Sequence, residues 1–290
     1  MRILVGGATG HLGAELIPAL LDRGHQVYAM VRPGSEGKLG AGRDRLAGIR
    51  VAELTDPVAL GRAVTGIDGV VSTIGMTIPV RGVDPDQVDH LGNVALLRAA
   101  ETGGVGHFAY VSVAGIDDPS ADHVPVVQAK RRFEEALRDS SVGWSIARPS
   151  GFFWNYGIFL SMARQRSFVP IVGDGSARST PIDAGDLAVA IADRVGRSGT
   201  TYSVGGPEDL SVNEIADQIQ DVLDRRIRRI HVPLSVARGA VAIVHPFSAS
   251  QSDMARFFVW AMTADVTADH VGTTRLADWM REHRDDQFSV

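Results

Sequence analysis

The stretch Gly6-Gly7-Ala8-Thr9-Gly10-His11-Leu12-Gly13 decides the fold of this chain. It directly follows a short apolar run, Arg2–Val5, and opens an amphipathic segment over 12–23. Glycines at such a turn allow backbone conformations that side chains forbid, and they let a pyrophosphate approach the amides of a helix N-terminus. The stretch therefore predicts a dinucleotide-binding turn, formed by Gly7, Thr9, Gly10, His11 and Leu12.

Short apolar runs alternate with helix-like segments through residue 150. Strict alternation predicts βαβ crossovers, and therefore an α/β fold with a Rossmann doubly wound parallel sheet. The predicted strands are Arg2–Val5, Gln26–Val31, Gly48–Leu54, Gly69–Ile74, His107–Val113 and Trp144–Ala147. The predicted helices cover 12–23, 57–65, 84–103 and 126–139.

The pattern changes after residue 150, where 13 of the 18 aromatic residues lie. Two apolar clusters occur there: Phe152, Phe153, Trp154, Tyr156, Phe159 and Met162 form the first, and Phe247, Met254, Phe257, Phe258, Trp260 and Met262 the second. Such clusters are typical of ordinary core, and as groups they also fit an apolar pocket under a cap. We predict an NADP-binding Rossmann domain over 1–150, with returning segments near 180–205, and a smaller C-terminal substrate-binding cap over most of 151–290.

Composition excludes several classes of protein. The net charge is −5, so no basic field favours a nucleic acid or an anionic membrane as partner, and a small-molecule substrate is expected. The chain has no cysteine, which excludes disulfides and thiolate metal sites. No pair of histidines has helical ligand spacing, so we expect no metal. We expect a cytoplasmic protein, monomeric or homodimeric, because no apolar run reaches the length of a membrane span.

Arg32 ends the second predicted strand, Gln26–Val31. NAD-specific folds place an acidic residue there for the ribose hydroxyls, whereas a guanidinium can bind the 2′-phosphate of NADP. A solvent-facing arginine is the alternative in a chain so rich in arginine. Arg32 favours NADP(H) as the cofactor.

Lys130 is one of only two lysines, the other being Lys38. It shares a predicted helix face with Val126, Phe133 and Leu137, and an ammonium on an apolar stripe needs a partner. Either the side chain reaches past the stripe to water, or it binds the nicotinamide ribose and lowers the pKa of a nearby proton donor.

Together with the glycine turn and Arg32, several further motifs resemble the short-chain dehydrogenase/reductase superfamily, in its extended and atypical NmrA-like and isoflavone-reductase-like branches. They are Glu53-Leu54-Thr55-Asp56, Val71-Ser72-Thr73-Ile74-Gly75, Phe108-Ala109-Tyr110-Val111-Ser112 and Ala147-Arg148-Pro149-Ser150-Gly151-Phe152. The resemblance implies that Glu53 and Leu54 contact the adenine end. It places Thr73 and Gly75 along the dinucleotide, Pro149 and Phe152 beside the nicotinamide, and Ser112 and Lys130 at the catalytic centre.

One departure from the resemblance concerns the catalytic Tyr-x-x-x-Lys pair, because Val126 stands four residues before Lys130. Another group would have to supply the proton: Ser112, a water, His123, Tyr156 or the substrate itself. A ketone or quinone-like carbonyl on an apolar, polycyclic aromatic molecule of the polyketide type needs the tyrosine least. The sequence therefore favours an NADPH-dependent ketoreductase, of the kind used in antibiotic biosynthesis. The alternative is a non-catalytic NADP(H) sensor of NmrA type, and a nucleotide-sugar epimerase or dehydratase is the third possibility.

Overall fold

A parallel seven-stranded sheet forms the centre of the protein, in the strand order β3-β2-β1-β4-β5-β6-β9. The computed structural model describes residues 1–76, 84–244 and 249–288. The sheet strands are β1 (Arg2–Gly6), β2 (Gln26–Val31), β3 (Gly48–Val51), β4 (Gly69–Ser72), β5 (His107–Val111), β6 (Gly143–Pro149) and β9 (Thr200–Val204). Every neighbouring pair is parallel, which confirms the predicted Rossmann fold class.

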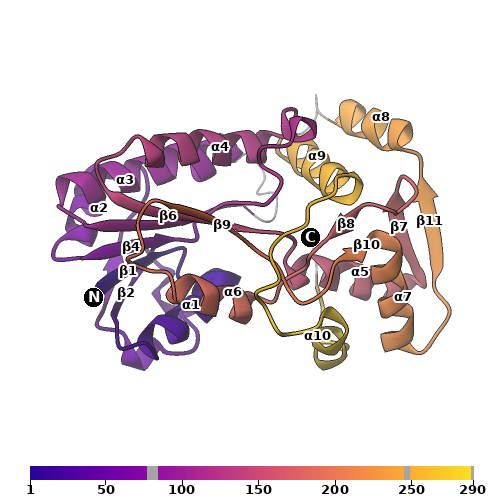
Figure 1. Ribbon diagram of the computed structural model, residues 1–290, viewed down its shortest axis with the longest axis horizontal. Helices are drawn as coiled ribbons and strands as arrows, with labels where there is room; N and C mark the ends of the chain where they lie inside the picture. Colours follow the sequence, from indigo (N-terminus) through magenta and orange to yellow (C-terminus); the bar gives the residue numbers. More distant parts are fainter. Residues whose placement is uncertain (77–83, 245–248, 289–290) are drawn as a thin grey trace.

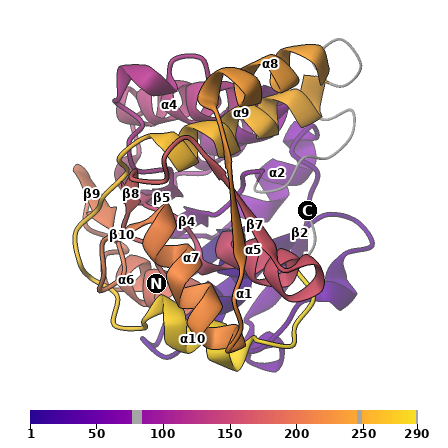
Figure 2. The same cartoon turned by 90° about the vertical axis from the view of Figure 1, so that its right-hand side faces the viewer.

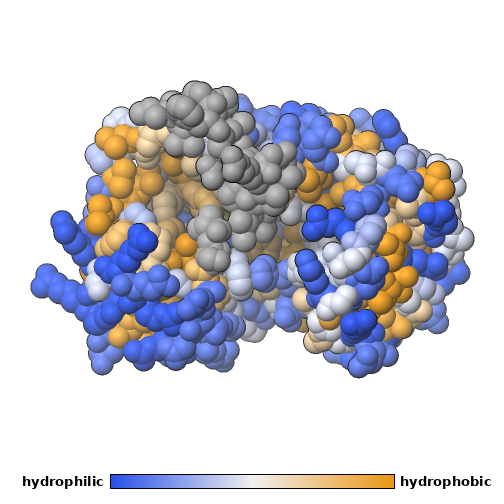
Figure 3. Space-filling model, turned by 180° about the vertical axis from the view of Figure 1, so that it is seen from behind, coloured by the Kyte–Doolittle hydropathy of each residue, from blue (hydrophilic) through white to orange (hydrophobic). Residues whose placement is uncertain are grey.

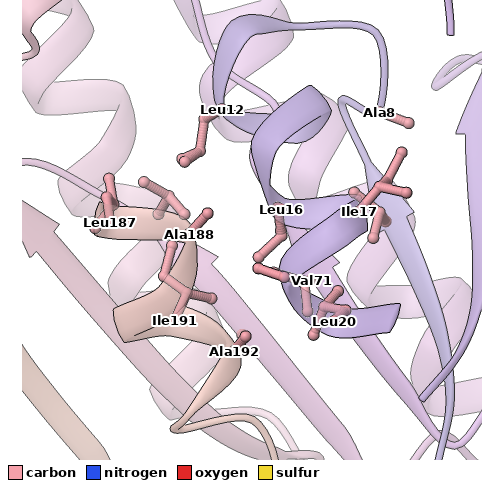
Figure 4. Packing of buried hydrophobic residues seen from close by; sticks show 14 of the residues in the cluster. Ala8, Leu12, Leu16, Ile17, Leu20, Val71, Leu187, Ala188, Ile191 and Ala192 are labelled. Atoms are coloured by element: carbon pink, nitrogen blue, oxygen red, sulfur yellow. The ribbon is translucent and has the colours of Figure 1, made fainter. Parts of the chain in front are cut away.

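Helices cover both faces of this sheet, as Figure 1 shows. One face packs against α1 (His11–Leu21) and α6 (Ala184–Ala192), and the other against α2 (Pro57–Val64), α3 (Asn93–Thr102) and α4 (Pro125–Arg138). Leu16, Leu20 and Ile191 lie in the contact between α1 and α6 (Figure 4). The sheet is buried on both sides, which explains its nearly continuous apolar strands.

Several predicted elements end elsewhere in the structure. The strand predicted over Gly48–Leu54 stops at Val51, because the chain turns where the Asp56 amide donates to the Glu53 carbonyl. The strands predicted to Ile74 and Val113 stop at Ser72 and Val111. The helix predicted over 84–103 begins as a π-helical segment, η3 (Asp86–Gly92), before continuing as α3.

The rest of the chain builds a second layer beside the carboxyl ends of the strands (Figure 2). It contains α5 (Phe153–Arg166), α7 (Val212–Leu223), α8 (Leu234–Val244), α9 (Ala249–Thr263) and α10 (Leu276–Glu282). Two small sheets accompany them: β7 (Phe168–Val172) pairs with β11 (Arg228–Val232), and β8 (Arg178–Ser179) pairs with β10 (Leu210–Ser211). Strand β9 returns from this layer to the central sheet beside β6.

Seen from behind, hydrophilic residues gather on the lower left of the molecule, whereas hydrophobic residues lie above them and in a strip on the right (Figure 3). Within the described ranges, no helix combines the length and apolar character needed to cross a membrane.

Candidate active site

The glycine turn between β1 and α1 is shaped for close backbone approach. Gly7 has φ +78°, in the left-handed region, and a Cβ there would lie 2.5 Å from Thr73 Oγ1. A Cβ on Gly13 would lie 2.2 Å from the Gly7 carbonyl oxygen, so only glycine lets α1 start this close to the turn. Gly10 caps α1 without a side-chain hydrogen bond, and the first turn carries no acidic residue. The N-terminus of α1 is thus an anion site of the type that holds pyrophosphate.

A cavity of about 710 Å³ opens beside this turn, at the carboxyl ends of the strands. Nine of the residues predicted for the site line it: Gly10, His11, Leu12, Thr73, Gly75, Ser112, Lys130, Pro149 and Phe152. Ligands of open α/β sheets bind at this edge, so the structure brings these distant residues together where the fold places its chemistry.

The other predicted residues lie outside this cavity. Thr9 is exposed on the turn and Glu53 is exposed after β3, whereas Leu54 is half-buried against the core under α2 and α3. Arg32 is exposed at the end of β2, and its guanidinium pairs with no carboxylate in the described part of the chain. The adenine contacts of Glu53 and Leu54 and the 2′-phosphate contact of Arg32 stay predictions.

Ser112 follows β5 directly and is held by its backbone, because its amide donates to the Ala147 carbonyl oxygen at 2.8 Å. The side chain is only 4% exposed and lines the cavity. Its Oγ atom has no hydrogen-bond partner among the described residues. A buried hydroxyl without a partner costs free energy unless a ligand satisfies it, so Ser112 is placed to bind one.

Lys130 forms an ion pair with Asp89, a residue that none of the sequence motifs indicated. The distance from Lys130 Nζ to Asp89 Oδ1 is 2.9 Å, and the aspartate side chain is fully buried. Asp89 Oδ2 also accepts the backbone amide of Met76 at 3.0 Å. The carboxylate thus connects α4, through Lys130, to the turn after β4.

Gly75 makes room for this ion pair. A Cβ at that position would lie 2.8 Å from Asp89 Oδ1 and 2.9 Å from Lys130 Nζ. The glycine therefore has a structural role beside the cofactor contact that the resemblance implies.

Burial and neighbouring charges have opposite effects on the pKa values of Asp89, Lys130 and Tyr110. Burial raises the pKa of the Asp89 carboxyl, while the Lys130 ammonium opposes that change. Burial also lowers the pKa of Lys130, but neighbouring negative charge outweighs it, and the pKa lies above its usual value. Tyr110, whose ring centroid is 5.5 Å from Nζ, has a pKa raised by burial in spite of Lys130. Lys130 thus lowers the pKa of this phenol, as expected for a neighbouring donor, but burial outweighs the effect of the ammonium.

Val126 occupies the cavity wall one helical turn before Lys130 and is 4% exposed. Of the other candidate proton donors, Tyr156 also lines the cavity. Its hydroxyl is 2.9 Å from Ser179 Oγ, and burial raises its pKa. His123 is exposed and lies away from the cavity lining. Ser112 and Tyr156 are the candidate hydroxyl donors that the structure places in the cavity.

Aromatic residues from two helices enclose the same cavity. Those of the predicted clusters that line it are Phe152, Phe153, Trp154, Tyr156, Phe159, Phe257, Phe258, Trp260 and Met262. Met162 and Met254 do not line it, and Phe247 lies outside the described residues. The Trp154 ring stacks on His11, with centroids 3.7 Å apart, so the glycine turn and α5 are in contact.

The described ranges contain no group of three His, Asp or Glu side chains arranged to hold a metal ion. The observed site is built instead from a helix N-terminus, one hydroxyl and one buried ion pair.

The missed residue Asp89 left a faint signal in the sequence. It shares a helical face with Asn93 and Leu96, at spacings of four and seven residues, where an apolar residue would be expected. Asn93 is likewise buried, and its amide nitrogen donates to the Asp89 carbonyl oxygen at 3.0 Å. Polar residues at these positions could have marked Asp89 as a buried polar residue, but not as the partner of Lys130.

Comparison with known proteins agrees with this geometry. A family described as NAD(P)H-binding matches residues 7–193, and the chain belongs to this family. The divinyl chlorophyllide a 8-vinyl-reductase of Oryza sativa subsp. indica is 33% identical over 261 residues, covering 83% of this chain and 64% of that protein. The (4-alkanoyl-5-oxo-2,5-dihydrofuran-3-yl)methyl phosphate reductase of Streptomyces griseus is 30% identical over 246 residues, covering 84% of this chain and 82% of that protein.

Solved structures share the whole fold. The NADPH-dependent quinone oxidoreductase of Escherichia coli, complexed with NADPH, matches 97% of this chain and 99% of its own, with a TM-score of 0.73 and 20% identity. The triphenylmethane reductase of Citrobacter sp., complexed with NADP(H), matches 97% and 99% with a TM-score of 0.75 and 19% identity. The chain is thus a member of the atypical, NmrA-like group of short-chain dehydrogenases/reductases, as the motifs predicted, and it binds NAD(P)H.

Proposed function

We propose that this protein is an NADPH-dependent reductase of a conjugated ketone or quinone-like carbonyl on an apolar, polycyclic aromatic molecule. The observation that carries the proposal is the cavity, because one space is lined by the N-terminus of α1, the unpartnered Ser112 hydroxyl, Lys130 and an aromatic wall. The quinone oxidoreductase with the same fold and the Streptomyces reductase support the reaction class. A polyketide-type substrate and a role in antibiotic biosynthesis are the finer parts of the proposal.

The residues have distinct roles in this proposal. The N-terminus of α1 holds the pyrophosphate, and Lys130 binds the nicotinamide ribose from its ion pair with Asp89. When bound, the dinucleotide supplies a hydride, which is the chemistry of the cofactor itself. Ser112 donates a hydrogen bond to the carbonyl oxygen as negative charge develops there. The aromatic residues of α5 and α9 exclude water and hold the flat substrate. In this proposal, residues 1–150 together with β9 bind the cofactor, and most of 151–290 binds the substrate.

The test is substrate-dependent loss of NADPH absorbance near 340 nm, with a panel of quinones and aryl ketones. We expect turnover by the wild type and its loss in Lys130→Ala, with circular dichroism confirming that the variant is folded. Tight NADPH binding without turnover of any compound in the panel would refute the reductase proposal.

A second candidate function is a non-catalytic NADP(H) sensor. It is favoured by Val126 at the cavity wall, where the superfamily's tyrosine would stand. It is also favoured by relatives named as photosystem II assembly factors, one of which, from Synechocystis sp., is 27% identical over 278 residues. The unpartnered Ser112 hydroxyl favours the reductase, because a sensor has no need of an unsatisfied buried donor at the acceptor end.

Cofactor choice gives a separate prediction. Arg32→Ala is expected to raise the Kd for NADPH about 10- to 100-fold, because charge-assisted hydrogen bonds to the 2′-phosphate contribute roughly 1.5–3 kcal/mol. The Kd for NADH should stay the same, since NADH has no 2′-phosphate. Fluorescence titration of both cofactors checks this, with the exposed α2 arginine variant Arg62→Ala as control. An unchanged preference in Arg32→Ala would remove the basis for NADP selectivity.

A further inference from the structure

Charge in the cavity lining is unbalanced toward acid. Glu15, Asp183 and Glu282 contribute three carboxylates, whereas Lys130 is the only lysine or arginine among the described lining residues. The Lys130 ammonium is already paired with Asp89 at 2.9 Å. Glu15 and Glu282 are exposed, and neither side chain has an ion pair or hydrogen bond in the described part of the chain. The space therefore offers negative charge to a ligand and no uncommitted lysine or arginine.

The lining also contains two histidines, His11 and His283. Burial lowers the pKa of His11, whose ring stacks on Trp154. The His283 ring stacks on Trp279 with centroids 4.3 Å apart, and its Nδ1 lies 2.9 Å from the Trp279 carbonyl oxygen. Both rings thus pack against tryptophan rings of the lining.

The acids and the α9 aromatic residues of the lining belong to helices on opposite sides of the molecule. Glu15 lies on α1, Asp183 caps α6, and Glu282 ends α10, and these three helices lie along the lower side of the molecule in Figures 1 and 2. Helix α9, which contributes Phe257 and Trp260, lies on the opposite, upper side. A flat ligand in this cavity thus lies in a space lined by both aromatic residues and carboxylates.

The lining also contains buried polar atoms that make no hydrogen bond to another described residue. Ser112 Oγ and Trp154 Nε1 are both buried and without a hydrogen-bond partner among the described residues. Ser112 is 4% exposed, so bulk water does not satisfy it. Because these two donors have no partner within the described residues, we infer that the cavity with its aromatic and acidic lining binds a ligand.

We propose that this site also accepts planar, delocalised aromatic cations, such as N-alkylated heteroaromatic rings, and that it reduces them. The proposal rests on the reductase function above for its hydride donor, a reduced nicotinamide dinucleotide. Hydride addition to such a cation forms one C–H bond, discharges the positive ring and oxidises the dinucleotide, and no proton is consumed. A carbonyl acceptor needs a proton in addition. A cationic acceptor thus suits both the acidic lining and the valine at position 126, since its reduction needs no proton donor at the position of the missing tyrosine.

Aromatic faces and carboxylates attract such a cation for two independent reasons. The negative face of an indole or phenyl ring binds a cation more tightly than a neutral ring of the same shape. Unpaired carboxylates add a Coulombic attraction that depends on salt, and they repel an anion. The ligand order expected from the lining is cation first, neutral ring second and anion last.

Binding is tested first, without turnover. The probes are N-methylacridinium, acridine at about pH 8, where it is neutral, and acridine-9-carboxylate, each titrated by fluorescence into the full chain saturated with NADP⁺. We expect N-methylacridinium to bind at least threefold more tightly than acridine, and the carboxylate to bind most weakly. Equal affinity for all three probes would overturn the proposal.

A charge variant then tests the assignment to residues. Glu15→Gln combined with Glu282→Gln should raise the Kd for N-methylacridinium about three- to tenfold, and it should weaken the salt dependence of binding. Acridine should bind as in the wild type. Glu135→Gln is the matched control, because Glu135 is an exposed α4 carboxylate outside the cavity lining. An equal change in Glu135→Gln, or no change in the double variant, would refute the role of the lining carboxylates.

Turnover separates this proposal from the proposed function. With NADPH, reduction of both N-methylacridinium and a quinone such as menadione supports both. Reduction of menadione alone overturns the cationic acceptor and leaves the reductase intact. Selective, carboxylate-dependent binding of the cation without turnover of either compound supports the selectivity of the site and overturns the reductase.

Discussion

Asp89→Ala is expected to lower the free energy of unfolding by about 3–5 kcal/mol, the largest stability effect that the site predicts. The substitution leaves the Lys130 ammonium largely buried, with its side chain only 14% exposed and no counterion. It also leaves the Met76 amide without its acceptor at 3.0 Å. Urea denaturation at neutral pH measures the effect as a fall in midpoint with an unchanged m-value.

Two further variants distinguish the effect of breaking the buried ion pair from the effect of removing a carboxylate as such. Asp86→Ala removes an aspartate of the same η3 segment whose partner Arg132 is 46% exposed, so a loss of less than about 1 kcal/mol is expected. Asp89→Leu combined with Lys130→Met replaces the pair by apolar side chains and should recover most of the stability lost in Asp89→Ala. A loss within about 1 kcal/mol for Asp89→Ala would show that Lys130 reaches water and that the ion pair is not essential.

Local patterns were sufficient to predict the cofactor half of the molecule. The glycine turn and the strand periods follow from residues close together in the sequence, and β2 has the predicted bounds, Gln26–Val31. The apolar stripe with Val126 and Phe133 on α4 is buried as predicted. These features depend on spacing within one element or on a single strand-to-helix turn, which periodicity measures directly.

Patterns within one element do not predict which distant segments of the chain pair with each other. The partner of Lys130 lies 41 residues earlier, in a π-helical segment whose geometry the 3.6-residue period does not describe. In the second layer, β7 pairs with β11 across about 60 residues, and the β7 sequence is apolar throughout, so it has no polar and apolar alternation from which to predict a face. The aromatic clusters could be assigned to a pocket only as groups, because a single aromatic residue at a core spacing has the same pattern whether it fills a core or lines a cavity.

Ser112→Ala is expected to lower kcat for a carbonyl acceptor about 10²- to 10³-fold. The hydroxyl is buried, lines the cavity and has no partner among the described residues, so its hydrogen bond is free for the charge that develops on the carbonyl oxygen. A donor that acts mainly in the transition state lowers kcat and kcat/KM together, leaving KM nearly constant. Steady-state kinetics with menadione measure both constants, and NADPH titration shows whether cofactor binding is intact.

The same variant also decides between the two kinds of acceptor. A cation such as N-methylacridinium has no oxygen on which negative charge develops, so Ser112→Ala should reduce its turnover far less than that of menadione. Ser140→Ala, at the end of α4 and away from the cavity lining, is the control for serine loss as such. An equal loss for both acceptors would assign Ser112 to cofactor or substrate placement, because only stabilisation of a developing alkoxide distinguishes a carbonyl from a cationic ring.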